Sequence, residues 1–296
     1  SAIRLSGSST DLVTAGGGGG GGWTGNGAAG GGTVGLSVSS IVTGGTQTAG
    51  GVTTSPATNG AAYLGGNGYH QGGGGGSGCF GGGGGHWVQG GAGGSSCVSL
   101  LTSGVTVAGD GTQPGAAINS IASSPITSTS PACTSGVGIG GLATTLAASR
   151  GGNGCVVIQY SSGGTTYYDT INYVGFNQTW TVPIGVSSVI FHALGAGGGG
   201  GRTGTTATGG GGGYATGQYS VTSGTTYTVI VGQGGGGVSA TSVSGMTGIY
   251  TPLTYGGGGR GGSFSAGWEG YYSSGGGRSA IRLPGSSTDL ATAAGG

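Results

Sequence analysis

Hydrophobic and polar residues alternate along several short stretches of the chain, with the two-residue period of a half-buried β-strand. The alternation is clearest over 226–231, Thr-Tyr-Thr-Val-Ile-Val, and it also runs through 179–183 and 214–221. Residues 155–160 and 189–194 are mostly apolar runs of strand length. No stretch has a convincing 3.6-residue period, so the pattern predicts an all-β chain with no significant α-helix.

Long glycine runs interrupt this pattern, and glycine accounts for 87 of the 296 residues. The longest run, 16–22, cannot be helical, because each glycine costs about 1 kcal/mol in a helix. Flexible linkers and silk-like stacked sheets are two interpretations of such runs. Aromatic residues such as Trp23, Trp87 and Tyr214 flank the runs, and a flexible linker would not require such side chains.

A third interpretation, which we favour, is a bundle of extended threefold helices with polyproline II geometry. Such helices make no internal hydrogen bonds, so their backbone groups need partners on neighbouring segments. Only glycine lets backbones approach closely from every side. We therefore expect a jelly-roll-like β-sandwich that carries an inserted polyglycine II bundle.

The first eighteen residues recur at the end of the sequence, 278 positions later (279 minus 1). Residues 1–18 and 279–296 differ at three positions, where the second copy has Pro284, Ala291 and Ala294 for Ser6, Val13 and Gly16. Such a repeat indicates one period of a longer array. We expect six residues of the two copies at an assembly junction: Arg4, Leu5, Asp11, Arg282, Leu283 and Asp289.

Charge and cysteine content favour an extracellular structural protein. Charged residues make up 4% of the chain, the net charge is +1 and there is no lysine. A nearly uncharged surface favours association. An even cysteine count in such a chain favours disulfides and an oxidising compartment. Three connectivities are open for the four cysteines, and we favour the local one, Cys79 with Cys97 and Cys133 with Cys155.

Catalytic and cofactor chemistry finds little support. The histidines, His70, His86 and His192, are scattered, the acidic residues form no spaced pair, and no Cys-x-x-Cys motif suggests zinc. Without lysine there is no P-loop, and six dispersed arginines make no nucleic-acid surface. No apolar run has the roughly 20 residues of a membrane span. We expect no enzyme, no cofactor and no metal.

Two segments could carry sugar. Asn177 begins the Asn-Gln-Thr sequon, a candidate N-glycosylation site. Residues 98–150 form a Ser/Thr-rich insertion with a proline-containing loop at 123–135. An unmodified surface loop is the alternative for both.

Several motifs resemble a glycine-rich β domain of extracellular fibre proteins, phage tail-fibre adhesins and receptor ectodomains. The matching segments are the opening strand 179–189, the glycine segment 193–200, the hairpin 220–232, the segments 275–283 and 10–18, and the closing strand 151–158. The resemblance implies a β-sandwich that carries a polyglycine bundle, and it implies no catalytic residues.

The order of these motifs is rotated, because the closing strand precedes the opening strand. We therefore expect residues 1–160 to be the back half of one domain and 179–296 the front half of the next, with a connector at 161–178. This arrangement predicts a subunit or repeat of an extracellular filament that binds copies of itself head to tail. The alternative is an adhesin that binds a receptor or glycan through aromatic residues.

Overall fold

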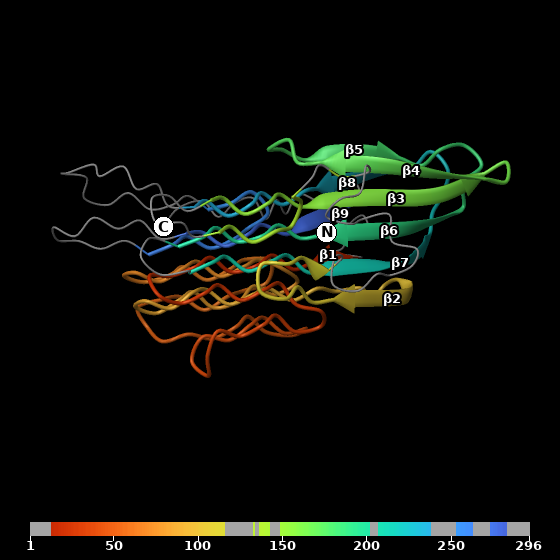
Figure 1. The fold of residues 1–296 in the computed structure, drawn as a ribbon. Helices are drawn as coiled ribbons and strands as arrows, with labels where there is room; N and C mark the ends of the chain where they lie inside the picture. The colour runs from red at the N-terminus through yellow and green to blue at the C-terminus, as the bar shows by residue number, and fades with distance from the viewer. Residues whose placement is uncertain are drawn as a thin grey trace.

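The computed structural model describes residues 13–115, 133, 136–142, 149–201, 207–237, 253–262 and 273–282. These residues contain nine β-strands, and Gly115 alone among them has a helical conformation, so the expected all-β class is confirmed. The strands are β1 (Thr14–Ala15), β2 (Thr102–Val107), β3 (Cys155–Ser162), β4 (Thr165–Asn172), β5 (Gln178–Thr181), β6 (Ser188–Leu194), β7 (Tyr214–Ser220), β8 (Thr226–Ile230) and β9 (Ser279–Arg282). Figure 1 shows the strands at one end of the molecule and the glycine-rich segments at the other.

The strands form two antiparallel sheets. The larger has the order β2-β7-β6-β3-β4, and the smaller has the order β1-β9-β8-β5. Buried side chains from both sheets form one hydrophobic cluster, so the sheets pack as a sandwich. The largest contributors to this core include Ile158, Phe191, Trp180 and Tyr227.

Five strands lie where the alternation or the apolar runs predict them, namely β3 and β5 to β8. Two others do not. The segment 161–178, expected as a connector, contains β4, an edge strand that pairs with β3 over eight positions. The insertion 98–150 contributes β2, the opposite edge of the same sheet.

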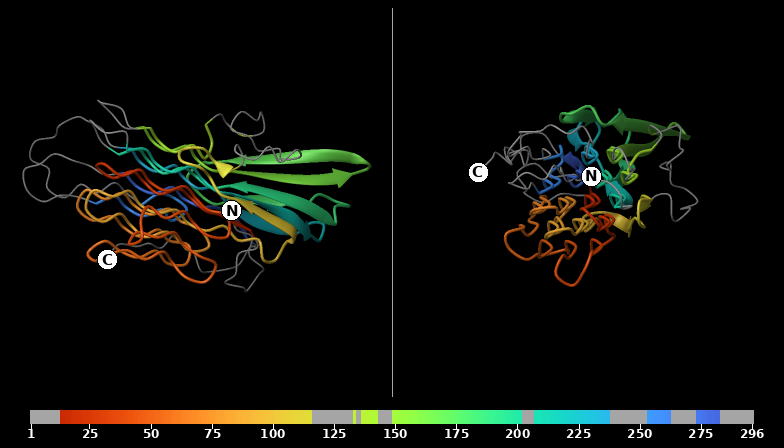
Figure 2. Two further views of the ribbon diagram at one scale, coloured as in Figure 1. Left: turned by 60° about the horizontal axis from the view of Figure 1, so that its bottom comes forward. Right: turned by 60° about the vertical axis from the view of Figure 1, so that its left-hand side comes forward.

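The glycine-rich segments lie side by side as a bundle of extended threads, best seen in the two views of Figure 2. The run 16–22 lies at its centre, and its amides donate to three different neighbours in turn. Gly17 and Gly20 donate to the segment 74–77, Gly18 and Gly21 to 196–199, and Gly19 and Gly22 to 25–28. Donors that return to the same neighbour every third residue are the signature of a threefold helix.

The carbonyl groups of the same run accept hydrogen bonds from three further segments. These are 91–94, 210–213 and 273–276. The central run therefore has six neighbours, and every one is held by backbone hydrogen bonds. This arrangement is the polyglycine II bundle that the composition predicts.

Strands from both expected half-domains lie in the same sheets of one chain. β3, which belongs to residues 1–160, pairs with β6, which belongs to residues 179–296. β1 likewise pairs with β9. The closing and opening strands of the rotated order thus meet within a single chain.

Candidate functional site

The two copies of the repeat meet in the smaller sheet, and we take this junction as the candidate functional site. β1 belongs to the first copy and β9 to the second. They pair antiparallel, with Thr14 opposite Ala280 and Ala15 opposite Ser279. β9 also pairs with β8, so it lies between β8 and β1 and joins β1 to its sheet.

Arg278 anchors the start of β9 in the bundle. Its side chain is buried, and its guanidinium carbon lies 4.9 Å from the centre of the Tyr63 ring. Nη1 donates hydrogen bonds to the carbonyl oxygens of Gly256 at 2.9 Å and Tyr63 at 3.3 Å, and the backbone amide donates to Ser77 Oγ at 2.6 Å. Carbonyl oxygens and an aromatic face thus solvate a buried charge.

Ser279, the first residue of β9, ties the two sheets together. Its hydroxyl donates to the carbonyl oxygen of Leu194 at 2.9 Å and accepts from the amide of Gly232 at 2.9 Å. Leu194 ends β6 in the larger sheet, whereas Gly232 follows β8 in the smaller one. The position before the strand and the first position within it are therefore fixed by specific polar contacts.

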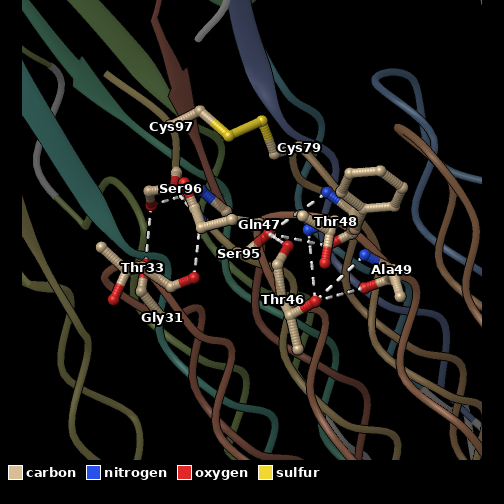
Figure 3. The surroundings of a disulfide bond; sticks show 12 residues. Gly31, Thr33, Thr46, Gln47, Thr48, Ala49, Cys79, Ser95, Ser96 and Cys97 are labelled. Atoms are coloured by element: carbon tan, nitrogen blue, oxygen red, sulfur yellow. Dashed lines mark hydrogen bonds between the residues drawn. A yellow bond between two sulfur atoms is a disulfide. The ribbon is translucent and has the colours of Figure 1, made fainter. Parts of the chain in front are cut away.

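A disulfide supports the other side of β1. The Thr14 amide donates to the Cys97 carbonyl at 2.7 Å, and the Cys97 amide returns a bond to Thr14 at 2.8 Å. Cys97 is bonded to Cys79, with their Cα atoms 5.9 Å apart (Figure 3). β1 is thus held between β9 and a covalently fixed segment.

Buried serines beside this disulfide bond to the ends of the glycine threads (Figure 3). Ser96 Oγ accepts from the Gly16 amide at 3.0 Å and donates to the Gly31 carbonyl at 2.6 Å. Ser95 Oγ donates to the Thr46 carbonyl at 2.6 Å. These hydroxyls satisfy backbone groups where the thread pattern ends.

The second disulfide, Cys133–Cys155, packs against the larger sheet with Leu194 and Tyr214. Both pairings are the local ones that we favour from the sequence, so this prediction is confirmed. His192 lies nearby, buried on β6, with Nδ1 2.7 Å from the Tyr214 hydroxyl. Burial lowers the pKa of His192 to about 4, so the ring is neutral at pH 7.

The junction residues expected from the sequence fall mostly outside the described residues. Arg4, Leu5, Asp11, Leu283 and Asp289 all lie there. Arg282 is the last residue of β9, paired with Thr228 of β8. The structure therefore brings together the strands of the two copies, through positions 14–15 and 279–280.

Asn177, the candidate glycosylation site, is exposed immediately before β5. Its Oδ1 accepts a hydrogen bond from the Tyr255 hydroxyl. The sequon is therefore at the surface, where an acceptor asparagine belongs.

Sequence reasoning missed the buried polar residues of the junction. Arg278 and the serines at the ends of glycine runs carry most of the side-chain contacts there. A usable signal is present, because serines, alone or in pairs, lie at or near the ends of glycine runs. The buried examples are Ser77, Ser95, Ser96, Ser273, Ser274 and Ser279.

A cluster of aromatic and histidine rings lies at the end of the bundle away from the sheets, where the threads turn back. Trp87 is 51% exposed, and its ring centroid lies 4.6 Å from that of His70 and 6.2 Å from that of Tyr69. The Tyr69 and His86 rings stack at 6.0 Å. The sequence shows these residues beside glycine runs, but it does not show that the folded bundle brings their rings together.

Three structural features can be compared with the functions expected from the sequence: clusters of metal-binding side chains, membrane-spanning helices and disulfides. The described residues contain no group of three or more metal-binding side chains, and none of their segments is a helix suited to crossing a bilayer. The two disulfides are compatible with an extracellular protein.

Comparison with known proteins agrees with the composition and with the resemblance of the motifs. No curated protein and no solved structure matches the chain. One family does match, over β5 to β9 and the segments around them. Residues 172–296 are similar to the family described as a glycine-rich domain.

Proposed function

We propose that the chain is a structural subunit, or one repeat, of an extracellular filament. Successive copies join head to tail when the Ser-Ala-Ile-Arg strand of one copy completes the smaller sheet of the next. The observation that carries this proposal is the pairing of β1 with β9, because the sheet takes one strand from each copy of the repeat.

A strand that one copy lends to the next makes a heterologous contact. Contacts of this kind that do not close into a ring generate filaments. Addition of a strand to a sheet supplies backbone hydrogen bonds in a fixed register and is an established mode of assembly. Here the register is set by Thr14 opposite Ala280.

The remaining features suit a load-bearing extracellular protein. Two disulfides fix the bundle and the larger sheet, and a net charge of +1 opposes self-association weakly. The partners we propose are copies of this chain, and the proposal involves no nucleic acid, cofactor or membrane span.

Analytical sedimentation and electron microscopy over a range of protein concentrations test this proposal. We expect filaments whose length grows with concentration. Ile281→Asp, which places a charge in β9 opposite Val229, should abolish them. Tyr168→Ser, on the exposed edge strand β4, is the matched control and should leave filament length unchanged. Monomers at every concentration would overturn the proposal.

A second function, binding of a glycan or surface receptor, is favoured by the ring cluster of Tyr69, His70, His86 and Trp87. Aromatic faces stack on the apolar faces of sugars, and Trp87 is half exposed. The test is adhesion to cells or glycan arrays by Trp87→Ala, with Tyr168→Ala as a control for loss of an exposed ring. Adhesion that is unchanged in Trp87→Ala would count against this function.

A further inference from the structure

The two sheets have four edge strands, and three of these edges carry a feature that hinders pairing with another chain. β1 is covered by Cys97, which exchanges two backbone hydrogen bonds with Thr14. β2 contains a register shift between Thr102 and Val105, and Ser103 within it has a φ of 53°. β5 is only four residues long. Covering segments, irregularities and short strands are the usual means by which proteins protect sheet edges.

β4 is the fourth edge, and in the part of the chain that the structure describes it has none of these features. It lies beyond β3 (Figure 1) and pairs with it over eight consecutive positions without a register shift. Its sequence, Thr-Thr-Tyr-Tyr-Asp-Thr-Ile-Asn, is rich in β-branched and aromatic residues and has no proline or lysine. Tyr167 and Tyr168 are 46% and 51% exposed. A long, regular and exposed edge of this kind is a template for another strand.

The turn between β3 and β4 determines which backbone groups of β4 point outward. It has two residues, Gly163 and Gly164, with φ angles of 59° and 81°. These angles are typical of a type I′ turn, in which the flanking pair, here Ser162 and Thr165, is hydrogen-bonded. Bonded and non-bonded pairs alternate along an antiparallel ladder. Residues 165, 167, 169 and 171 therefore bond to β3, whereas the backbone groups of 166, 168, 170 and 172 point away from it.

One end of this outward edge already has a partner within the chain. Gln178 Nε2 donates to the Asn172 carbonyl oxygen at 2.8 Å, which agrees with the outward direction of that carbonyl. Three residues with outward amide and carbonyl groups remain: Thr166, Tyr168 and Thr170. No described residue forms a hydrogen bond with these backbone groups, so they are available to a further strand.

The charge of β4 favours a neutral partner. Asp169 is the one charged residue of the strand, and its Oδ2 accepts a hydrogen bond from Trp180 Nε1 at 2.7 Å. Trp180 and Ile158, which lies opposite Asp169 in β3, both belong to the core between the sheets, so Asp169 faces that side. The outward residues are threonine and tyrosine. A strand of the same neutral kind fits this edge, and a net charge of +1 lets two copies of the chain approach.

β4 is complementary to itself in one antiparallel register. With Tyr168 opposite Tyr168 of a second copy, Thr166 lies opposite Thr170, and all three outward residues meet outward residues. Each such pair exchanges two backbone hydrogen bonds, and aromatic and threonine pairs across strands are favourable. A shift by one residue pairs outward with inward groups. A shift by two leaves one outward residue of each strand unmatched and, in one direction, places Asp169 opposite Asp169.

We infer that β4 is an interaction surface for a second copy of this chain, which adds its own β4 antiparallel with Tyr168 at the twofold axis. The two five-stranded sheets then form one continuous sheet, and the contact closes on itself as a symmetric dimer. β4 takes no part in the pairing of β1 with β9, so this contact joins chains side by side and leaves a head-to-tail contact unchanged. The inference does not rest on the proposed function.

An exchange of charges at the twofold axis tests the inference. Tyr168→Lys and Tyr168→Glu each place like charges opposite one another in a pair of identical chains, which destabilises the pair. Both are made in the Ile281→Asp chain, in which filaments do not obscure the dimer, and sedimentation equilibrium gives the dissociation constant. We expect dimers for Ile281→Asp itself and a dissociation constant raised at least about tenfold in either charged variant. A mixture of the two variants should dimerise again.

Ile184→Lys and Ile184→Glu are the matched controls, because Ile184 is 92% exposed and lies outside β4. Alone or mixed, they should leave the dissociation constant unchanged. All variants should keep their Tm within about 2 °C, because the substituted side chains are exposed. Monomers of Ile281→Asp at every concentration would overturn the inference. So would a dimer that Tyr168→Lys does not weaken, because another surface would then hold it.

Hydrogen exchange in the otherwise intact chain gives a second measurement that does not use Ile281→Asp. The amides of 167, 169 and 171 bond to β3 and should be protected in every state of the protein. Those of 166, 168 and 170 should be protected in the dimer and should exchange rapidly in Tyr168→Lys. Rapid exchange of these outward amides in both proteins would overturn the inference.

These outcomes are distinct from failure of the proposed function. Dimers formed by a chain that makes no filaments would uphold the β4 contact and refute head-to-tail assembly. Filaments of the intact chain, together with monomers of Ile281→Asp, would do the reverse.

Discussion

The sandwich and the polyglycine bundle are both tightly packed, but they bury different portions of the chain. The sandwich buries side chains, such as Phe191 and Val229, between two sheets whose backbones pair only within each sheet. The bundle buries backbone, because the central run 16–22 has six hydrogen-bonded neighbours and no side chains.

This difference changes what each region can tolerate. A side-chain core can lose or rearrange volume at a graded cost. At most glycines of the bundle the space beside the thread is already filled by a neighbouring carbonyl group. An added Cβ at Gly18 or Gly19, for example, would lie 2.0 Å from a backbone oxygen. Even the smallest possible side chain, a methyl group, should therefore be strongly destabilising there.

The largest effect we predict is that of a single methyl group in the bundle. At Gly235 a Cβ would lie 2.2 Å from the Ser274 carbonyl oxygen and 2.4 Å from the Gly199 nitrogen. Gly235→Ala should cost about 5 kcal/mol or more, at the upper end for single substitutions. Urea unfolding measures this cost.

The adjacent glycine is a matched control. At Gly236 the nearest atom to an added Cβ is Ser274 Oγ at 3.5 Å, an ordinary contact. Gly236→Ala should therefore be nearly neutral. Equal effects at the two positions would refute the view that close backbone approach limits the bundle.

In the sandwich the corresponding change is removal of a ring. Phe191 is fully buried, with the Tyr219 and Tyr227 rings 6.3 Å away. Phe191→Ala should cost about 4 kcal/mol, and Phe191→Leu considerably less, because most of the volume remains. Urea unfolding of both variants checks the graded response. A Leu variant as unstable as the Ala variant would show a core as intolerant as the bundle.

The next largest predicted effect is a loss of stability at low pH. We assign it to the sandwich, because His192 lies in the larger sheet. Its pKa is about 4 in the folded state against an ordinary 6.5, so between these values the unfolded chain binds the extra proton. Stability should therefore fall as the pH falls from about 6.5 to about 4, by about 3 kcal/mol in total. The buried cation of the bundle, Arg278, keeps its charge throughout this range.

His192→Gln should remove this contribution, because glutamine does not titrate and can still bond to the Tyr214 hydroxyl. The measurement is the free energy of unfolding at pH 7 and pH 4 for both proteins. A pH dependence that survives unchanged in His192→Gln would assign it to other groups.

The sequence predicts the sandwich better than it predicts the bundle contacts, for a physical reason. Side chains that alternate between core and solvent leave a two-residue pattern, which β5 and β8 follow, whereas β3 and β6 are recognised as apolar runs of strand length. The two missed strands are sheet edges. β4 exposes Tyr167 and Tyr168 in succession, and β2 contains a register shift between Thr102 and Val105.

Within the bundle, identical glycines give no hint of which thread lies beside which. The composition indicates polyglycine II, but the centrality of 16–22 depends on neighbours hundreds of residues away in the chain, such as 273–276. Only the cysteines and the serines near the ends of glycine runs mark positions within the bundle in the sequence. The local disulfides are the connectivity that we favour from the sequence, whereas the contacts of Arg278 with Tyr63 and Gly256 leave no signal in it.

The smallest predicted effect concerns the boundary between the two regions. Ser96 Oγ bonds to the Gly16 amide and the Gly31 carbonyl, both buried, where β1 continues into the central thread. Ser96→Ala leaves both groups without this partner and should cost about 2 kcal/mol. Ser161→Ala, which removes an exposed hydroxyl from β3, is the control and should cost less than about 0.5 kcal/mol. Hydrogen exchange at Gly16 is the sharper measurement, because its amide protection should fall while that of β6 is retained. Equal loss of protection in both places would mean that the sandwich and the bundle unfold as one unit, and that their different packing does not divide the molecule into separate regions of stability.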